Sequence, residues 1–166
     1  MILAVALMIL GILSRFIVHI PNFTPVIAIA LFSGVYIPKK YSIILPIIMF
    51  AVSDLVIGFH NTMLFTYGSV LVIACWGLWL REHKNFKNTV VMGFVSSVFF
   101  FVVTNLGVWI VGGLYPQTMR GLADCFVLAI PFFRNELIST FLYSAVLFYG
   151  YEVMAARMKT TRLAHH

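Results

Sequence analysis

The segment Pro25-Val26-Ile27-Ala28-Ile29-Ala30-Leu31-Phe32-Ser33-Gly34-Val35-Tyr36-Ile37, followed by Pro38-Lys39-Lys40, decides the topology of this chain. It is apolar but short, because a helix that crosses a bilayer needs about 20 mostly apolar residues, or fewer where neighbouring helices shelter it. Pro21 and Pro25 prevent an unbroken helix from running into it. If the segment crosses the membrane, Lys39-Lys40 lies on the same side as the N-terminus. If it folds back, the pair lies on the other side.

The positions of the Lys and Arg residues favour the view that the segment 25–37 crosses the membrane. Eight of the eleven Lys and Arg residues form three clusters, separated by two expected crossings each: Lys39-Lys40, Arg81/Lys84/Lys87 and Arg157/Lys159/Arg162. Loops on the cytoplasmic side of a membrane are enriched in Lys and Arg. A common side for all three clusters requires six crossings, with both termini in the cytoplasm. Arg15, Arg120 and Arg134 are then left for the opposite face.

Composition places the chain among integral membrane proteins. It is 62% hydrophobic and 10% charged, with a mean hydropathy of +1.03, whereas a soluble domain is about 25% charged. The net charge of +6 belongs to residues that flank apolar spans, so we expect no nucleic-acid partner. Residues 1–162 are expected to form one transmembrane domain, and 163–166 are interpreted as the remnant of a tag. Met1 to Ser14 lack a basic region and a cleavage site, which argues against a removed signal peptide.

The predicted fold is all-α: a six-helix bundle integral to the membrane. The expected spans are 2–18, 25–37, 41–59, 62–80, 88–111 and 135–156. Residues 122–133 are apolar but too short to cross alone, so a re-entrant or interfacial segment is expected there.

Two pairs of small residues lie one helical turn apart. Ala30 and Gly34, and Gly93 and Ser97, would allow neighbouring backbones to approach closely inside a membrane. For either pair alone, chance is about as good an explanation as helix packing, because small residues are common in apolar sequence.

Polar side chains at the end of the bundle opposite the basic clusters are the best indication of function. A charged group at mid-span costs about 2.5 to 3.5 kcal/mol, so such groups usually face a cavity or a partner. Arg15 and His19 share a helical face, and so do Asn105 and Trp109. The candidate substrate-binding residues are His19, Asn22, Asp54, His60, Asn105, Trp109, Cys125, Arg134 and Asn135.

Most of these candidates also have a purely structural explanation. Asp54 is equally well explained as the ion-pair partner of Arg15 or Arg134. Asn105 is more often a hydrogen-bonding residue between helices than a ligand contact. The stretch from Arg134 to Glu136 is also explained as a helix start, with Asn135 as its N-cap.

The sequence holds no pattern that indicates an enzyme. GxSxG, HExxH, P-loop and GxGxxG motifs and paired carboxylates are missing. His60 at a span end is more often solvated, and Cys75 and Cys125 are more often small buried residues than reactive thiols. Catalysis within the membrane would rest on isolated Asp54, His60 and Cys125, so we expect no enzymatic activity and no intrinsic cofactor.

Several stretches together carry a family resemblance: Pro21-Asn22-Phe23-Thr24-Pro25, Ser53-Asp54-Leu55 with Gly58-Phe59-His60, Thr104-Asn105 with Val108-Trp109, Tyr115-Pro116, and Pro131-Phe132-Phe133-Arg134-Asn135. As a set they resemble a family of small bacterial membrane proteins of uncertain function that is similar to the substrate-binding S-components of energy-coupling-factor (ECF) transporters. The resemblance implies a six-helix subunit of the bacterial inner membrane. Such a subunit binds a vitamin-like molecule from outside, often together with a membrane scaffold and ATPases.

Among such proteins, the small solitary ones concerned with cobalamin are closest in size. In those proteins a cysteine is associated with cobalt ligation. No motif assigns that role to Cys125 or Cys75. Of the two, Cys125 is better placed to meet an external ligand. S-components often carry an AxxxA stripe on the first helix for docking the scaffold, which Ala4 and Ala6 do not form.

The resulting hypothesis is a substrate-binding subunit for uptake of a vitamin or similar micronutrient, with cobalamin or another corrinoid as the first candidate. The alternative is a small oligomeric channel or structural membrane protein that binds no vitamin.

Overall fold

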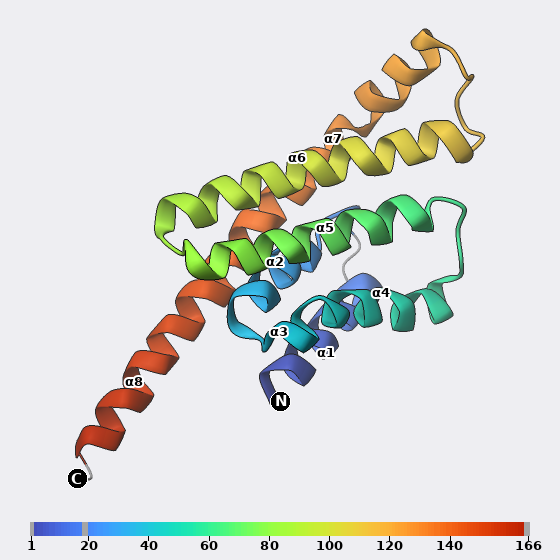
Figure 1. The fold of residues 1–166 in the computed structure, drawn as a ribbon. Helices are drawn as coiled ribbons and strands as arrows, with labels where there is room; N and C mark the ends of the chain where they lie inside the picture. The colour runs from blue at the N-terminus through green and yellow to red at the C-terminus, as the bar shows by residue number, and fades with distance from the viewer. Residues whose placement is uncertain (1, 18–19, 165–166) are drawn as a thin grey trace.

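The short apolar segment forms helix α2 (Val26–Tyr36) at the centre of the molecule (Figure 1). The computed structural model describes the backbone of residues 2–17 and 20–164 and the side chains of residues 3–17 and 20–157. Every residue from Val26 to Val35 is buried. At 1.5 Å per residue, α2 is about 16 Å long, roughly half the thickness of the hydrocarbon core of a bilayer.

Proline sets both ends of α2. The carbonyl of Pro25 accepts the hydrogen bond from the Ile29 amide (2.8 Å) that opens the helix. At the other end Ile37 is extended (φ −91°, ψ 143°), because the ring of Pro38 disfavours the helical conformation in the residue before it.

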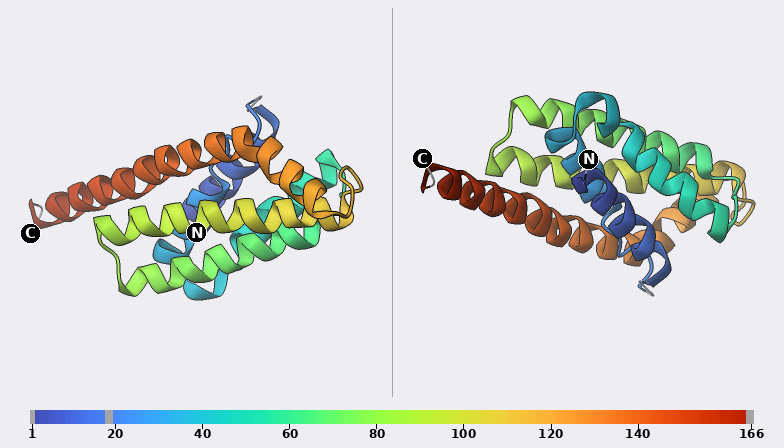
Figure 2. Two further views of the ribbon diagram at one scale, coloured as in Figure 1. Left: turned by 90° about the horizontal axis from the view of Figure 1, so that it is seen from above. Right: turned by 90° about the horizontal axis from the view of Figure 1, so that it is seen from below.

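The other helices enclose α2. It contacts α1, α4, α5, α6 and α7, and the two views of Figure 2 show α5 and α6 running side by side. The elements around α2 are α1 (Ile2–Ile17), α3 (Lys39–Ser42), α4 (Ile44–Ile57), α5 (Met63–Glu82), α6 (Phe86–Val111), α7 (Met119–Ser144), a π-helical turn η1 (Ala145–Tyr149) and α8 (Gly150–Ala164).

The described part of the chain is all-helical, as the sequence predicted. It contains four helical stretches that are long and apolar enough to cross a membrane: Lys39–Ile57, Met63–Glu82, Phe86–Val111 and Met119–Arg157. Large apolar side chains point away from the bundle along them, including Val56 (75% exposed) and Leu64 (79% exposed). Such a surface suits lipid rather than water.

Helices α2 and α5 approach each other closely at two glycines. A Cβ atom added to Gly34 would lie 2.3 Å from the backbone carbon of Gly77, and one added to Gly77 would lie 2.6 Å from the carbonyl oxygen of Leu31. The role predicted for Ala30 and Gly34 is therefore confirmed, with Gly77 as the facing residue. The second pair packs less tightly, because a Cβ on Gly93 would make only an ordinary contact with Phe141 at 3.6 Å.

The prediction for residues 122–133 was wrong. Instead of a separate re-entrant segment, they form the first half of α7, which begins at Met119 and continues through η1 into α8. Thr118 is the N-cap, since its side chain accepts a hydrogen bond from the Gly121 amide (3.1 Å). Asn135, expected as an N-cap, lies inside the helix. The bend of α7 in Figure 2 is explained by Pro131, which removes a backbone hydrogen bond without ending the helix.

The two ends of the bundle differ in chemistry. Lys39, Arg81 and Lys84 gather at one end, here called the basic end, where Lys39 lies 3.8 Å from Glu82 and Lys84 forms an ion pair with Glu152 of α8. The expected common end is thus confirmed for residues of the first two basic clusters, whereas the side chains of Lys159 and Arg162 in the third lie outside the described residues. The α4–α5 and α6–α7 connections lie at the opposite end, here called the loop end (Figure 1).

We expect Gly77→Ala to lower the free energy of unfolding by about 1 to 3 kcal/mol, because the new methyl group would collide with the backbone of α2. Gly68→Ala, in the same helix, is the matched control: no atom lies within 4 Å of its added Cβ, and alanine favours helix by up to about 1 kcal/mol. Thermal unfolding in detergent measures both. Equal midpoints for the two variants would contradict the close approach.

Candidate functional site

A pocket of about 500 Å³ opens among the helices at the loop end. Its wall is built from the end of α1, the start of α2, the loop before it, the α4–α5 connection and the facing sides of α6 and α7. The lining residues are Arg15, Pro21, Asn22, Thr24, Val26, Ile27, Phe50, His60, Thr66, Phe100, Thr104, Asn105, Val108, Leu114, Tyr115, Cys125, Leu128, Ala129, Phe132 and Glu136. The volume lies in the range of about 300 to 1,000 Å³ typical of small-molecule sites.

The loop before α2 is fastened to α7. The side-chain amide of Asn135 donates to the carbonyl of Pro21 (3.1 Å), and the hydroxyl of Ser139 donates to that of Thr24 (3.1 Å). Between these points Asn22 has a positive φ of 59°, a conformation that asparagine tolerates better than most residues. Helix α7 thus fixes one wall of the pocket.

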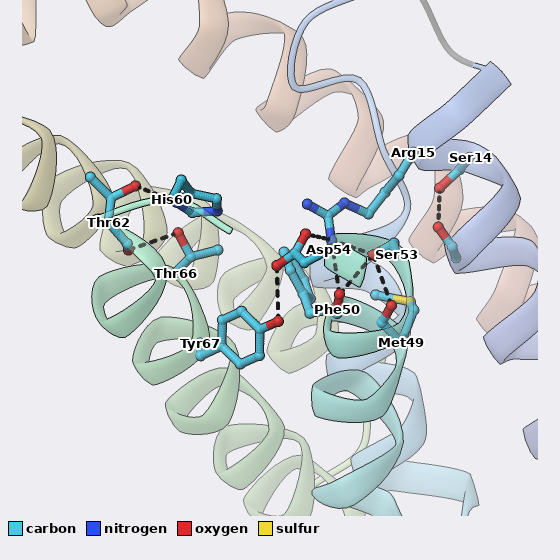
Figure 3. A network of polar contacts seen from close by, with 11 residues as sticks. Ser14, Arg15, Met49, Phe50, Ser53, Asp54, His60, Thr62, Thr66 and Tyr67 are labelled. Atoms are coloured by element: carbon cyan, nitrogen blue, oxygen red, sulfur yellow. Dashed lines mark hydrogen bonds and ion pairs between the residues drawn. The ribbon is translucent and has the colours of Figure 1, made fainter. Parts of the chain in front are cut away.

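An ion-pair network joins α1 to α4 beside the pocket (Figure 3). The guanidinium of Arg15 lies 2.7 Å from the fully buried carboxylate of Asp54 and also donates to the hydroxyl of Ser53. Tyr67 of α5 donates to the other carboxylate oxygen (2.9 Å), and the Arg15 guanidinium lies 4.3 Å from the centre of the Phe50 ring. The charge of Asp54 is therefore matched within the protein.

Further polar groups complete the wall. His60, exposed at the rim, shares a hydrogen bond with the hydroxyl of Thr62 (2.8 Å), as Figure 3 shows. On α6, the side-chain amide of Asn105 donates to the carbonyl of Phe101 (2.7 Å). The buried thiol of Cys125 lies 3.5 Å from the carbonyl of Asn105.

The pocket brings together four of the predicted site residues: Asn22, His60, Asn105 and Cys125. Among the described residues, the other candidates do not line it. Asp54 pairs with Arg15, Arg134 is exposed, and the indole of Trp109 donates to the carbonyl of Pro116 (3.0 Å) within the α6–α7 connection.

Asn135, the remaining described candidate, holds the loop before α2, and His19 lies outside the described residues.

Glu136 is the pocket residue that the sequence-based site omitted. It is 5% exposed, and one of its carboxyl oxygens is buried with no hydrogen-bond partner among the described residues. The available signal was its position four residues after Phe132 and seven after Ala129, which puts all three on the face of α7 that lines the pocket. Because residues 134–136 were also explained as a helix start, Glu136 was not included among the site residues.

These side chains can bind and orient a small molecule through one carboxyl group, amides, hydroxyls and aromatic rings. Within the side chains that the structure describes, no three His, Cys, Asp or Glu residues come together as a metal site would require.

The chain belongs to the family of unknown function DUF6580, which matches residues 1–162. Comparison with curated proteins and with solved structures gave no match.

We expect Asp54→Asn to lower the free energy of unfolding by about 3 to 5 kcal/mol, because the largely buried Arg15 would lose its counter-charge. Asp124→Asn is the control, since Asp124 is exposed on α7. Replacing both partners, as in Arg15→Met with Asp54→Leu, is expected to recover part of the loss. Thermal unfolding of the three variants and of the unaltered protein measures these losses, and an Asp54→Asn variant as stable as the control would refute the role of Asp54 as counter-charge.

Proposed function

We propose that the protein is a substrate-binding membrane subunit for uptake of a vitamin or similar micronutrient. Its role is to bind and orient the substrate without making or breaking bonds. By resemblance to S-components, a separate membrane scaffold and ATPases are the partners that would supply the energy.

The pocket at the loop end carries this proposal. It combines a small-molecule volume of about 500 Å³ with a mixed wall, apolar at Val26 and Phe132 and polar at Asn22, Asn105 and Glu136. Polar side chains inside an apolar bundle usually face a cavity or a partner, and small-molecule sites typically combine an apolar wall with a few polar groups. The Arg15–Asp54 pair and the fastened loop before α2 hold its wall in place without occupying it.

The proposed orientation of the protein in the membrane follows from the basic residues at one end of the bundle. With Lys39, Arg81 and Lys84 in the cytoplasm of a bacterium, the pocket opens outward. In this arrangement the chain crosses the inner membrane six times. Helices α1 and α2 are shorter than the other crossings, and their neighbours shelter them.

Cobalamin or another corrinoid is the first substrate to test, on the strength of the resemblance. Cys125 is the candidate cobalt ligand, since it lines the pocket and Cys75 is exposed away from it. A corrinoid is larger than the drug-sized molecules that about 500 Å³ encloses, so part of it would remain outside the rim.

The most direct experiment is mass spectrometry of small molecules that co-purify with the protein in mild detergent, with an absorbance spectrum to reveal a corrinoid. A stoichiometric micronutrient is the expected result. A protein that carries no small molecule, binds none of a vitamin panel in calorimetry and instead conducts ions as a stable homo-oligomer would favour the channel alternative.

We expect Thr104→Trp to abolish binding of the co-purifying molecule, because the indole would fill part of the pocket. Val102→Trp is the matched control on α6, since Val102 is exposed on the outside of the bundle. Retention of the molecule by each variant is measured by mass spectrometry after identical purification. Loss from neither variant, or from both to the same extent while both remain folded, would place the binding site elsewhere.

A further inference from the structure

The five acidic residues of the chain differ in how their charge is matched. Asp54, Glu82 and Glu152 each form an ion pair with a basic side chain, and Asp124 is exposed on α7. Glu136 is buried, and no basic side chain of the described residues forms an ion pair with it. A carboxylate removed from water without a counter-charge is costly, so such groups inside membrane spans are usually functional.

The basic side chains and several of the polar side chains around the pocket are already engaged or face elsewhere. Arg15 is committed to Asp54 and Ser53. The side chains of Thr104 and Asn105 donate to carbonyls of their own helix, at 2.7 Å each. His60 at the rim bonds to Thr62, and Arg134, two positions before Glu136, is exposed on another face of α7. Within the described lining of the pocket, Glu136 is therefore the acid that is left without a basic partner.

Aromatic rings surround the same space. Phe100 of α6, Phe132 of α7 and Tyr115 of the α6–α7 connection line the pocket together with Glu136. The face of an aromatic ring attracts a cation, most strongly where water is excluded. A buried acid within an aromatic wall is suited to a positively charged nitrogen attached to an apolar body.

We infer that the pocket binds an organic cation, such as a protonated amine or a quaternary ammonium compound, whose positive nitrogen pairs with Glu136. The inference rests on the proposed binding function and narrows its substrate class, placing cationic micronutrients ahead of the corrinoid. A cation would stabilise the ionised carboxylate of Glu136, whereas an anionic ligand would oppose its ionisation and an uncharged ligand could exchange only a hydrogen bond with it.

The test uses ligands that share one body and differ in charge. Tryptamine (cationic), tryptophol (uncharged) and indole-3-acetate (anionic) form one series, and choline with its uncharged analogue 3,3-dimethylbutan-1-ol forms a second. Dissociation constants are measured by calorimetry on the full chain in lipid nanodiscs. Each cation is expected to bind at least about tenfold more tightly than its uncharged counterpart, through a charge-assisted hydrogen bond for tryptamine and through ion-pair and cation–π contacts for choline.

Glu136→Gln is the decisive variant, because it keeps the shape of the side chain and removes its charge. It should abolish the preference for the cation, and the control Glu82→Gln, at the basic end, should retain it. The inference is overturned if no cation binds better than its uncharged counterpart, including the case in which none binds, or if Glu136→Gln keeps the preference. An uncharged or anionic co-purifying molecule that Thr104→Trp displaces would overturn it while leaving the proposed binding function intact.

Discussion

The close approach of α2 and α5 is the constraint on which the rest of this structure depends. Helix α2 is too short to cross a bilayer alone, so its position is set by the neighbours that bury it. The facing glycines, Gly34 and Gly77, bring the two backbones into direct contact. Inside a membrane such packing replaces the hydrophobic effect as the force that joins helices. The first residues of this buried helix, Val26 and Ile27, line the pocket. Its last residues lie at the basic end.

The two ends of α2 are held by different interactions. At the basic end, Arg81 of α5 donates to the carbonyls of Gly34 and Ile37, which accept no helical hydrogen bond once Pro38 ends the helix. At the loop end, α7 fastens the segment before α2 through Asn135 and Ser139. The pocket therefore lies between α7 and a central helix that is held at both ends.

Sequence alone predicted the features that depend on local pattern. Apolar length predicted the helices, Pro21 and Pro25 predicted the break before α2, and the spacing of Ala30 and Gly34 predicted a close contact. The sequence did not identify Gly77 as the residue that faces Gly34, because a contact between helices far apart in sequence leaves no local signal. Helix α7 was divided wrongly because Pro131 and the polar residues around it resemble a boundary. Within a packed helix that proline produces only a bend, and the polar side chains either hold a loop or face the pocket.

The two buried acids of the bundle show why pattern could not separate structural from functional residues. Asp54 and Glu136 both stand in apolar helices, and both are costly there. The cost of Asp54 is offset by Arg15 and Tyr67, which come from two other helices. Nothing among the described side chains does the same for Glu136, although Arg15 lines the same pocket. The sequence left Arg15 and Arg134 both open as partners of Asp54. The tertiary structure pairs Asp54 with Arg15, and among the described residues Glu136 is then the buried acid without an ion partner.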